Sequence, residues 1–166
     1  MDTFDSALHS GYTMAIPPEY DWFGPLVGDW DFKYYDHRKS TGFAVTGQWL
    51  FRRILRGTGV EDILISPSID ALDGAEETNG AYATSIRMFN PREKCYDVTY
   101  SSRARTLTMR FVKEGNKLVG TAAQNPNEKW VFSDIREGSF RWSKVTVLSS
   151  GACQTDCSIY ATRKRA

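Results

Sequence analysis

The chain has 166 residues, which suits one domain, because two independent cores of half that size would barely offset the chain entropy lost on folding. Hydrophobic residues make up 41% and charged residues 25%, a globular composition that favours neither disorder nor a membrane protein. The 21 basic and 20 acidic side chains leave a net charge of +1, so no overall field favours nucleic acid or an anionic membrane as a partner.

The first residues predict an arm and no secretion signal. Asp2 and Asp5 stand where a signal peptide carries basic residues, and no apolar run follows them. Pro17 and Pro18 break any helix, and a short helical turn is expected over residues 19–26. We therefore expect an N-terminal arm over residues 1–22, a barrel domain over residues 23–166 and a cytoplasmic location.

From Trp30 onward, apolar residues recur with a period of two, which is typical of strands with one buried face. The expected strands, about ten in all, cover residues 30–35, 45–55, 60–65, 81–89, 95–101, 106–112, 117–123, 129–135, 140–148 and 157–164. Glu114-Gly115-Asn116 and similar hairpin signals join them, and residues 66–80 form a longer acidic connection, either a binding loop or a surface loop.

Sequential hairpins with few long crossovers favour an up-and-down barrel over a Greek-key sandwich, because closure removes both exposed sheet edges. The sequence therefore predicts an all-β fold, a single closed antiparallel up-and-down β-barrel of about ten strands with an N-terminal arm or short helix. Cys95, Cys153 and Cys157 are odd in number, so we expect free thiols and neither a disulfide framework nor a metal site.

The run from Phe23 to Trp30, FGPLVGDW, resembles the opening of lipocalin-like (calycin) barrels, in which a Gly-x-Trp places an indole in the barrel floor. Proteins of this kind commonly pair that indole with a basic residue of the last strand. The resemblance implies that Arg163 or Lys164 stacks on Trp30 as a cation on a π-face.

The chain is most similar to a largely uncharacterised family of bacterial lipocalin-like barrels. The matching pieces, in this order over residues 23–164, are Trp49-x-Phe51-x-Arg53, Gly59-Val60-Glu61-Asp62, Ser85-Ile86-Arg87-Met88-Phe89-Asn90-Pro91 and Arg141-Trp142. The resemblance implies a fold more than an activity. Haem-binding relatives use a histidine near the C-terminal strands, where this chain has none, so we expect no haem and no other cofactor.

Charged residues on otherwise apolar strands are the first candidates for a site. They are Arg53, Asp62, Arg87 and Asp134. A charge that faces a barrel lumen is costly unless it is paired, so Arg–Asp pairing inside the barrel would explain all four. Structural pairing and contact with a ligand both remain open for each residue, and an unpaired arginine in the lumen would hold a carboxylate, enolate or phenolate oxygen.

Two functions remain open, with binding slightly favoured. The first is binding of a small, partly apolar or aromatic molecule in an aromatic-lined lumen, because large rings commonly line concave ligand sites. Its expected ligand-binding residues are Tyr34, Trp49, Arg53, Trp130, Asp134 and Trp142. We expect no nucleic-acid or membrane partner, and a monomer or homodimer.

The second is a cofactor-independent isomerase, cyclase or dehydratase/lyase that acts in the same cavity on a polyketide- or terpenoid-like intermediate. The common catalytic motifs are absent from the sequence, but an Asp or His base beside a Tyr donor suffices for proton transfer next to a carbonyl. The expected catalytic residues are His37, Asp62, Arg87 and Tyr100.

Overall fold

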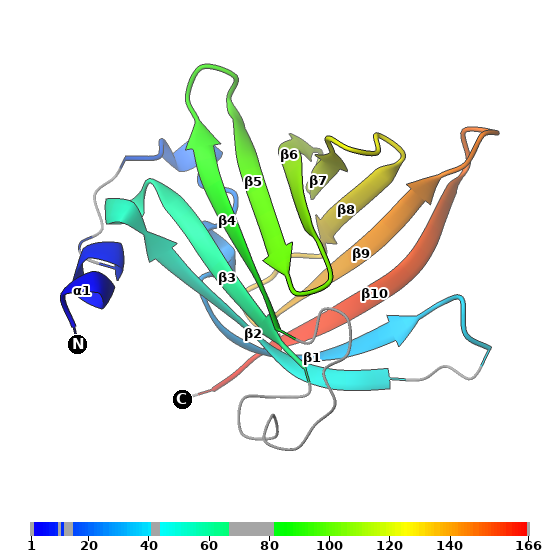
Figure 1. Ribbon diagram of the computed structural model, residues 1–166, viewed down its shortest axis with the longest axis horizontal. Helices are drawn as coiled ribbons and strands as arrows, with labels where there is room; N and C mark the ends of the chain where they lie inside the picture. The colour runs from blue at the N-terminus through cyan, green and yellow to red at the C-terminus, as the bar shows by residue number, and fades with distance from the viewer. Residues whose placement is uncertain (1, 10, 12–14, 41–43, 67–81, 166) are drawn as a thin grey trace.

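The computed structural model describes residues 2–9, 11, 15–40, 44–66 and 82–165. In these residues ten antiparallel strands form a closed barrel, in which every strand pairs with its neighbours in sequence and β1 pairs with β10 to close the ring (Figure 1). The predicted all-β, up-and-down barrel is confirmed. The expected long connection lies, apart from Ser66, outside the described residues.

The strands agree with the expected ones to within a few residues at most ends. They are β1 (Gly28–Asp36), β2 (Ala44–Ile54), β3 (Gly59–Ile65), β4 (Tyr82–Asn90), β5 (Cys95–Ser102), β6 (Thr106–Glu114), β7 (Lys117–Ala122), β8 (Glu128–Ser133), β9 (Ser139–Val147) and β10 (Cys153–Arg163). Four short helices complete the described elements: α1 (Thr3–His9), η1 (Pro18–Tyr20), η2 (Gly24–Leu26) and η3 (Leu55–Gly57).

The alternation of apolar and polar residues determines which face of a strand points into the barrel. On β6, for example, buried Leu107, Met109 and Phe111 alternate with exposed Thr108 and Arg110. Because successive side chains of a strand point to opposite faces, the alternating apolar set of a strand points into the lumen.

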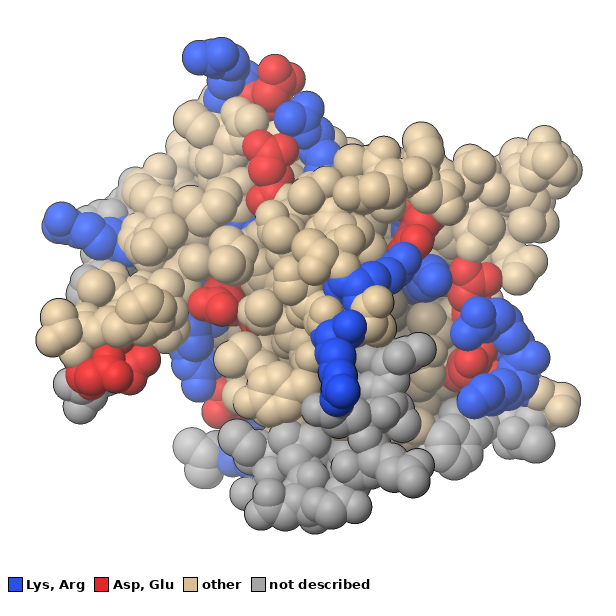
Figure 2. All heavy atoms as spheres, viewed as in Figure 1, with Lys and Arg blue, Asp and Glu red and all other residues tan. Residues whose placement is uncertain are grey.

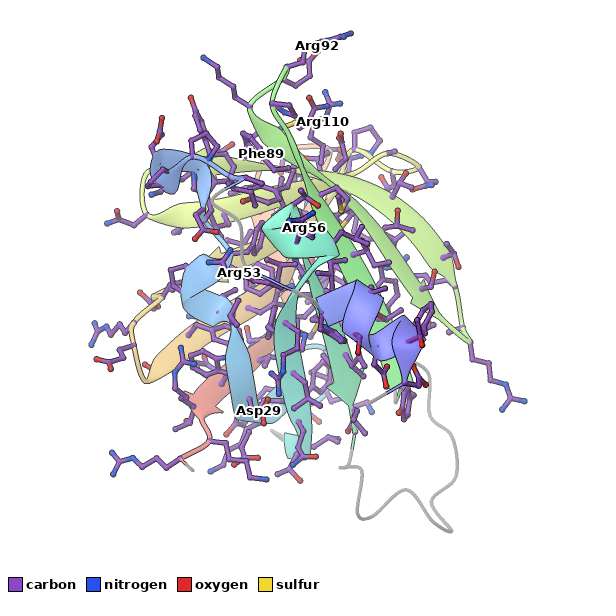
Figure 3. The ribbon with its side chains drawn as sticks, turned by 90° about the vertical axis from the view of Figure 1, so that its left-hand side faces the viewer. Asp29, Arg53, Arg56, Phe89, Arg92 and Arg110 are labelled. Atoms are coloured by element: carbon purple, nitrogen blue, oxygen red, sulfur yellow. The ribbon has the colours of Figure 1, made fainter. Side chains whose placement is uncertain are left out.

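One end of the barrel is closed by η1, η2 and the residues between them. The buried ring of Phe23 makes edge-to-face contacts with Tyr96, Phe111 and Phe132, at centroid distances of 4.9, 5.5 and 5.7 Å. The Tyr96 hydroxyl donates a hydrogen bond to the Tyr20 carbonyl oxygen (2.6 Å). We call this closed end the floor; Figure 3 shows Arg53 and Phe89 there.

Arg163 fastens the last strand to the floor. Its guanidinium lies 4.2 Å from the ring centroid of Trp30, which confirms the expected stacking. It also donates hydrogen bonds to the carbonyl oxygens of Pro25, Val27 and Glu137, at 2.6–2.9 Å. The Trp30 indole in turn donates to the Leu26 carbonyl oxygen (2.7 Å), so both ends of the barrel sequence meet at this point.

Two expectations about strand ends were wrong. Leu55 does not continue the inner face of β2; it begins η3 with φ 50° and is 48% exposed. Asp134 follows the end of β8, also with φ 50°, and is exposed. In both places the chain leaves the extended conformation, so the period of two no longer predicts the direction of the side chain.

The surface carries charges of both signs. On the face drawn in Figure 2, basic side chains are interspersed with acidic ones, in agreement with the small net charge. Exposed ion pairs join neighbouring strands, such as Arg110 with Asp97 (3.2 Å) and Arg52 with Asp29 (2.6 Å). No helix in the described residues is long and apolar enough to cross a bilayer.

Candidate functional site

The inward-facing residues of the barrel form two levels. The lower lumen, next to the floor, consists of rings and aliphatic side chains around a buried ion pair. The upper lumen lies toward the other end of the barrel and combines aromatic rings with polar groups. We define it by Tyr34, Trp49, Tyr100, Glu128, Trp130, Trp142, Lys144 and Cys157.

Arg87 and Asp62 form the ion pair of the lower lumen. Nη1 of Arg87 lies 2.5 Å from Oδ2 of Asp62, and the two residues are only 1% and 2% exposed. Burial raises the pKa of Asp62, while Arg87 and the Trp49 side chain act in the opposite direction by favouring the carboxylate. The predicted Arg–Asp pairing inside the barrel therefore holds for these two residues.

The Arg87 guanidinium is also enclosed by rings. Its central carbon lies 5.0, 5.4 and 5.5 Å from the ring centroids of Phe23, Phe51 and Phe132. These contacts place the cation against three π-faces and fill the space between it and the floor. Between the two readings of Arg87 and Asp62, this enclosure favours structural pairing over contact with a ligand.

Four aromatic rings from four strands form a row across the upper lumen. Trp49 on β2 contacts Trp142 on β9 (6.2 Å, 80°), Trp142 contacts Trp130 on β8 (5.5 Å, 77°), and Trp130 contacts Tyr100 on β5 (5.0 Å, 87°). All three contacts are edge-to-face, the arrangement that the ring quadrupoles favour. The three indoles are buried, with 4% of Trp49, 9% of Trp142 and 8% of Trp130 exposed, whereas Tyr100 is partly exposed.

Glu128 fixes one end of this aromatic row. Its Oε2 accepts hydrogen bonds from the Trp130 indole (3.0 Å) and from Nη2 of Arg105 (2.5 Å), and its Oε1 accepts one from Nη1 of Arg105 (3.2 Å). Burial raises the pKa of Glu128, but Arg105 and nearby Lys144 lower it by more, so the pKa lies below its usual value. Glu128 is thus an ionised anchor for both partners.

Tyr34 and Cys157 face each other between β1 and β10. Burial raises the pKa of the Tyr34 phenol, and its interaction with the Cys157 thiol raises it further. Burial likewise raises the pKa of Cys157, although Tyr34 and Lys144 oppose the increase. At neutral pH both groups are therefore neutral, and the phenol is a hydrogen-bond donor.

The remaining predicted site residues lie outside the upper lumen. Arg53 pairs with Asp21 at the floor, where Nη1 and Nη2 donate hydrogen bonds of 3.0 and 2.6 Å, so its expected partner inside the lumen was wrong. Asp134 is exposed beyond the end of β8, so its expected place in a lumenal pair was also wrong.

His37 lies on the outer side of the wall. Its Nε2 is 2.9 Å from the Ser158 hydroxyl, which also contacts the Ser143 hydroxyl (3.3 Å) and Nη2 of Arg141 (3.4 Å). Ser158 is opposite Tyr35 in the strand register, on the face away from the lumen. The four hypothesised catalytic residues therefore have separate surroundings: Asp62 and Arg87 pair with each other, Tyr100 packs on Trp130, and His37 bonds outside.

Two polar residues of the upper lumen, Glu128 and Lys144, were missed by reasoning from sequence. Each was detectable, because Glu128 precedes Trp130 by two residues and Lys144 follows Trp142 by two, which places them on the inner face. Among the described residues, no group of three or more His, Cys, Asp or Glu side chains is arranged to hold a metal ion.

Comparisons with known proteins support the fold alone. No protein-family model matches the chain, and no curated protein matches it. Among solved structures, Rv2717c from M. tuberculosis aligns with 90% of this chain and 99% of its own length, with a TM-score of 0.57 and 12% identity. A redesigned β-barrel aligns with 86% of this chain and 94% of its own, but its TM-score is only 0.33 at 13% identity. At 12% identity, the likeness to Rv2717c supports the barrel fold and carries no activity with it.

Proposed function

We propose that this protein is a lipocalin-like barrel that binds a small, partly apolar or aromatic molecule in its upper lumen. The observation that carries the proposal is the row of four rings, Trp49, Trp142, Trp130 and Tyr100, together with the polar groups beside it. Apolar walls with a few placed polar groups are typical of small-molecule sites. The floor below is closed by Phe23 and the Arg87–Asp62 pair, which confines a ligand to the upper level.

Binding is favoured over the catalytic alternative because of where the polar residues lie. Proton transfer needs a base within hydrogen-bond reach of the reacting atom, usually beside a donor. Asp62 is occupied by Arg87 in the lower lumen, and His37 bonds with Ser158 on the outer side. In this proposal, residues 23–166 form the binding domain and residues 1–22 an arm.

The proposal is tested by titration with N-phenyl-1-naphthylamine, a neutral aromatic probe whose fluorescence rises in an apolar site. We expect saturable binding and quenching of tryptophan emission by energy transfer. Trp142→Leu removes one ring from the row and should weaken binding about fivefold, since an aromatic contact contributes about 1 kcal/mol beyond its area.

Trp22→Leu is the matched control, because Trp22 lies at the floor against Tyr20 and Tyr96 and outside the upper lumen. It should leave the affinity for the probe unchanged. Circular dichroism verifies that both variants keep the fold. Absence of saturable binding to the native chain, or equal weakening by the two substitutions, would contradict the proposed site.

A further inference from the structure

Lys144 differs from the other cations around the upper lumen in having no partner. Arg105 is paired with Glu128, and Arg38 is paired with Asp36 at 3.0 Å. Lys129, on the outer face, donates a hydrogen bond from Nζ to the Thr121 hydroxyl (2.7 Å). Within the part of the chain that the structure describes, the Lys144 ammonium makes neither a hydrogen bond nor an ion pair.

The strand register places Lys144 beside the aromatic row. It is opposite Trp130 of β8 and opposite Cys157 of β10, two residues after Trp142 on the same face of β9. It is partly buried. Its charge lowers the pKa of both Glu128 and Cys157, as expected of an ammonium that lies between them.

Neighbouring groups offer Lys144 little compensation. The acidic residues around it have other partners: Glu128 accepts hydrogen bonds from Arg105 and Trp130. Asp36, opposite Cys157, pairs with Arg38, and Asp156, beside Cys157 at the bulge of β10, accepts hydrogen bonds from Thr146 and Gln154. Cys157 and Tyr34 are neutral at pH 7, because burial raises the pKa of each. A partly buried cation without a directly bonded acidic partner costs free energy, and this cost falls when a ligand supplies an anion.

We propose that the upper lumen accepts a single-headed organic anion, a carboxylate or sulfonate on an apolar or aromatic body, with Lys144 as its counter-charge. The inference rests on the proposed function and adds the chemical class of the ligand. The anionic group lies against Lys144, with the Tyr34 hydroxyl as a second donor across Cys157. The body of the ligand lies along Trp142 and Trp130.

The test compares two probes with the same rings, 8-anilinonaphthalene-1-sulfonate and neutral N-phenyl-1-naphthylamine. A hydrogen bond to a charged group contributes about 1.5–3 kcal/mol, so loss of Lys144 should weaken binding of the sulfonate about tenfold or more. Lys144→Met is therefore expected to lose affinity for the sulfonate and to keep its affinity for the neutral probe. Lys144→Arg keeps the positive charge and should therefore keep most of the native affinity for the sulfonate.

Lys129→Met is the matched control, because Lys129 lies opposite Val145, next to Lys144 in the sheet but on the outer face. It removes one positive charge at the same level of the barrel and should leave the affinities for both probes unchanged. Lys144→Gln, also uncharged, replaces Lys144→Met if the latter does not fold.

The outcomes separate the two proposals. If the neutral probe binds but Lys144→Met leaves the sulfonate affinity unchanged, the anion inference is wrong and the binding function stands. Equal losses in Lys129→Met and Lys144→Met would also overturn it, because the effect would then be one of overall charge. If neither probe binds the native chain, the proposed function fails, and the inference fails with it.

Discussion

Removing Arg87 should be among the most destabilising single changes in the barrel. Arg87→Met keeps much of the side-chain volume against Phe23, Phe51 and Phe132 but leaves the Asp62 carboxylate buried without its counter-charge. Breaking one side of a fully buried pair costs about 3–5 kcal/mol. Since a domain is stable by only about 5–15 kcal/mol, this is a large part of the total.

Urea unfolding followed by far-ultraviolet circular dichroism measures the loss. Arg52→Met is the matched control, since Arg52 is on the same sheet and pairs with Asp29 at the surface, where a salt bridge contributes at most about 1 kcal/mol. The double variant Asp62→Leu with Arg87→Met removes both charges and should recover most of the lost stability.

The loss should also depend on pH in a defined direction. Burial raises the pKa of Asp62 above its ordinary 3.8, so the folded state favours the protonated carboxyl. The free energy of unfolding that Arg87→Met loses should therefore be largest at neutral pH. It should become smaller as the pH falls through the raised pKa of Asp62 toward 3.8. The reasoning is refuted if Arg87→Met costs no more than Arg52→Met, or if the double variant is as unstable as the single one.

Three further outcomes follow from other contacts. Arg163→Met removes three hydrogen bonds and the cation over Trp30, and should lower the free energy of unfolding by about 2–4 kcal/mol in a urea titration; a loss below about 1 kcal/mol would contradict the role of Arg163 at the floor. Gly47→Ala places a methyl group against both the Phe32 ring and the Ile65 carbonyl oxygen and should cost about 1–3 kcal/mol by the same titration, so a neutral result would mean that the ring and the neighbouring strand both move apart. Of the three thiols, only exposed Cys153 should react quickly with Ellman's reagent in the native protein, whereas all three should react after denaturation; fast reaction of a second native thiol would contradict the burial of the other two.

The fold was predictable because its determinants are local. The period of two and the turn residues define each strand, and a run of hairpins leaves few topologies besides a barrel. The stacking of Arg163 on Trp30 came from the lipocalin-like resemblance and is confirmed. Whether the chain belongs to that family stays a prediction.

The site was harder to predict because it depends on contacts between distant segments. Period two placed Arg53 in phase with Trp49, yet Asp21 from the floor segment draws its guanidinium away from the lumen. The prediction for Asp134 failed because β8 ends at Ser133, and the alternation of apolar and polar residues does not show where a strand ends. Among the described cations around the upper lumen, it is Lys144 whose side chain makes no ion pair, and this can be seen only when the partners of the other cations are known.

The pairing of β1 with β10 has a consequence for how the chain folds. Every other strand pair in the described barrel joins sequence neighbours, but Trp30 meets Arg163 only after all the strands between them have been made. Such a long-range closure is slow, and during synthesis it follows the formation of the other nine strands. A nascent chain or fragment that ends before residue 153 has free edges on β1 and β9, ready to pair with other chains, so the final eleven-residue strand also protects the protein from aggregation.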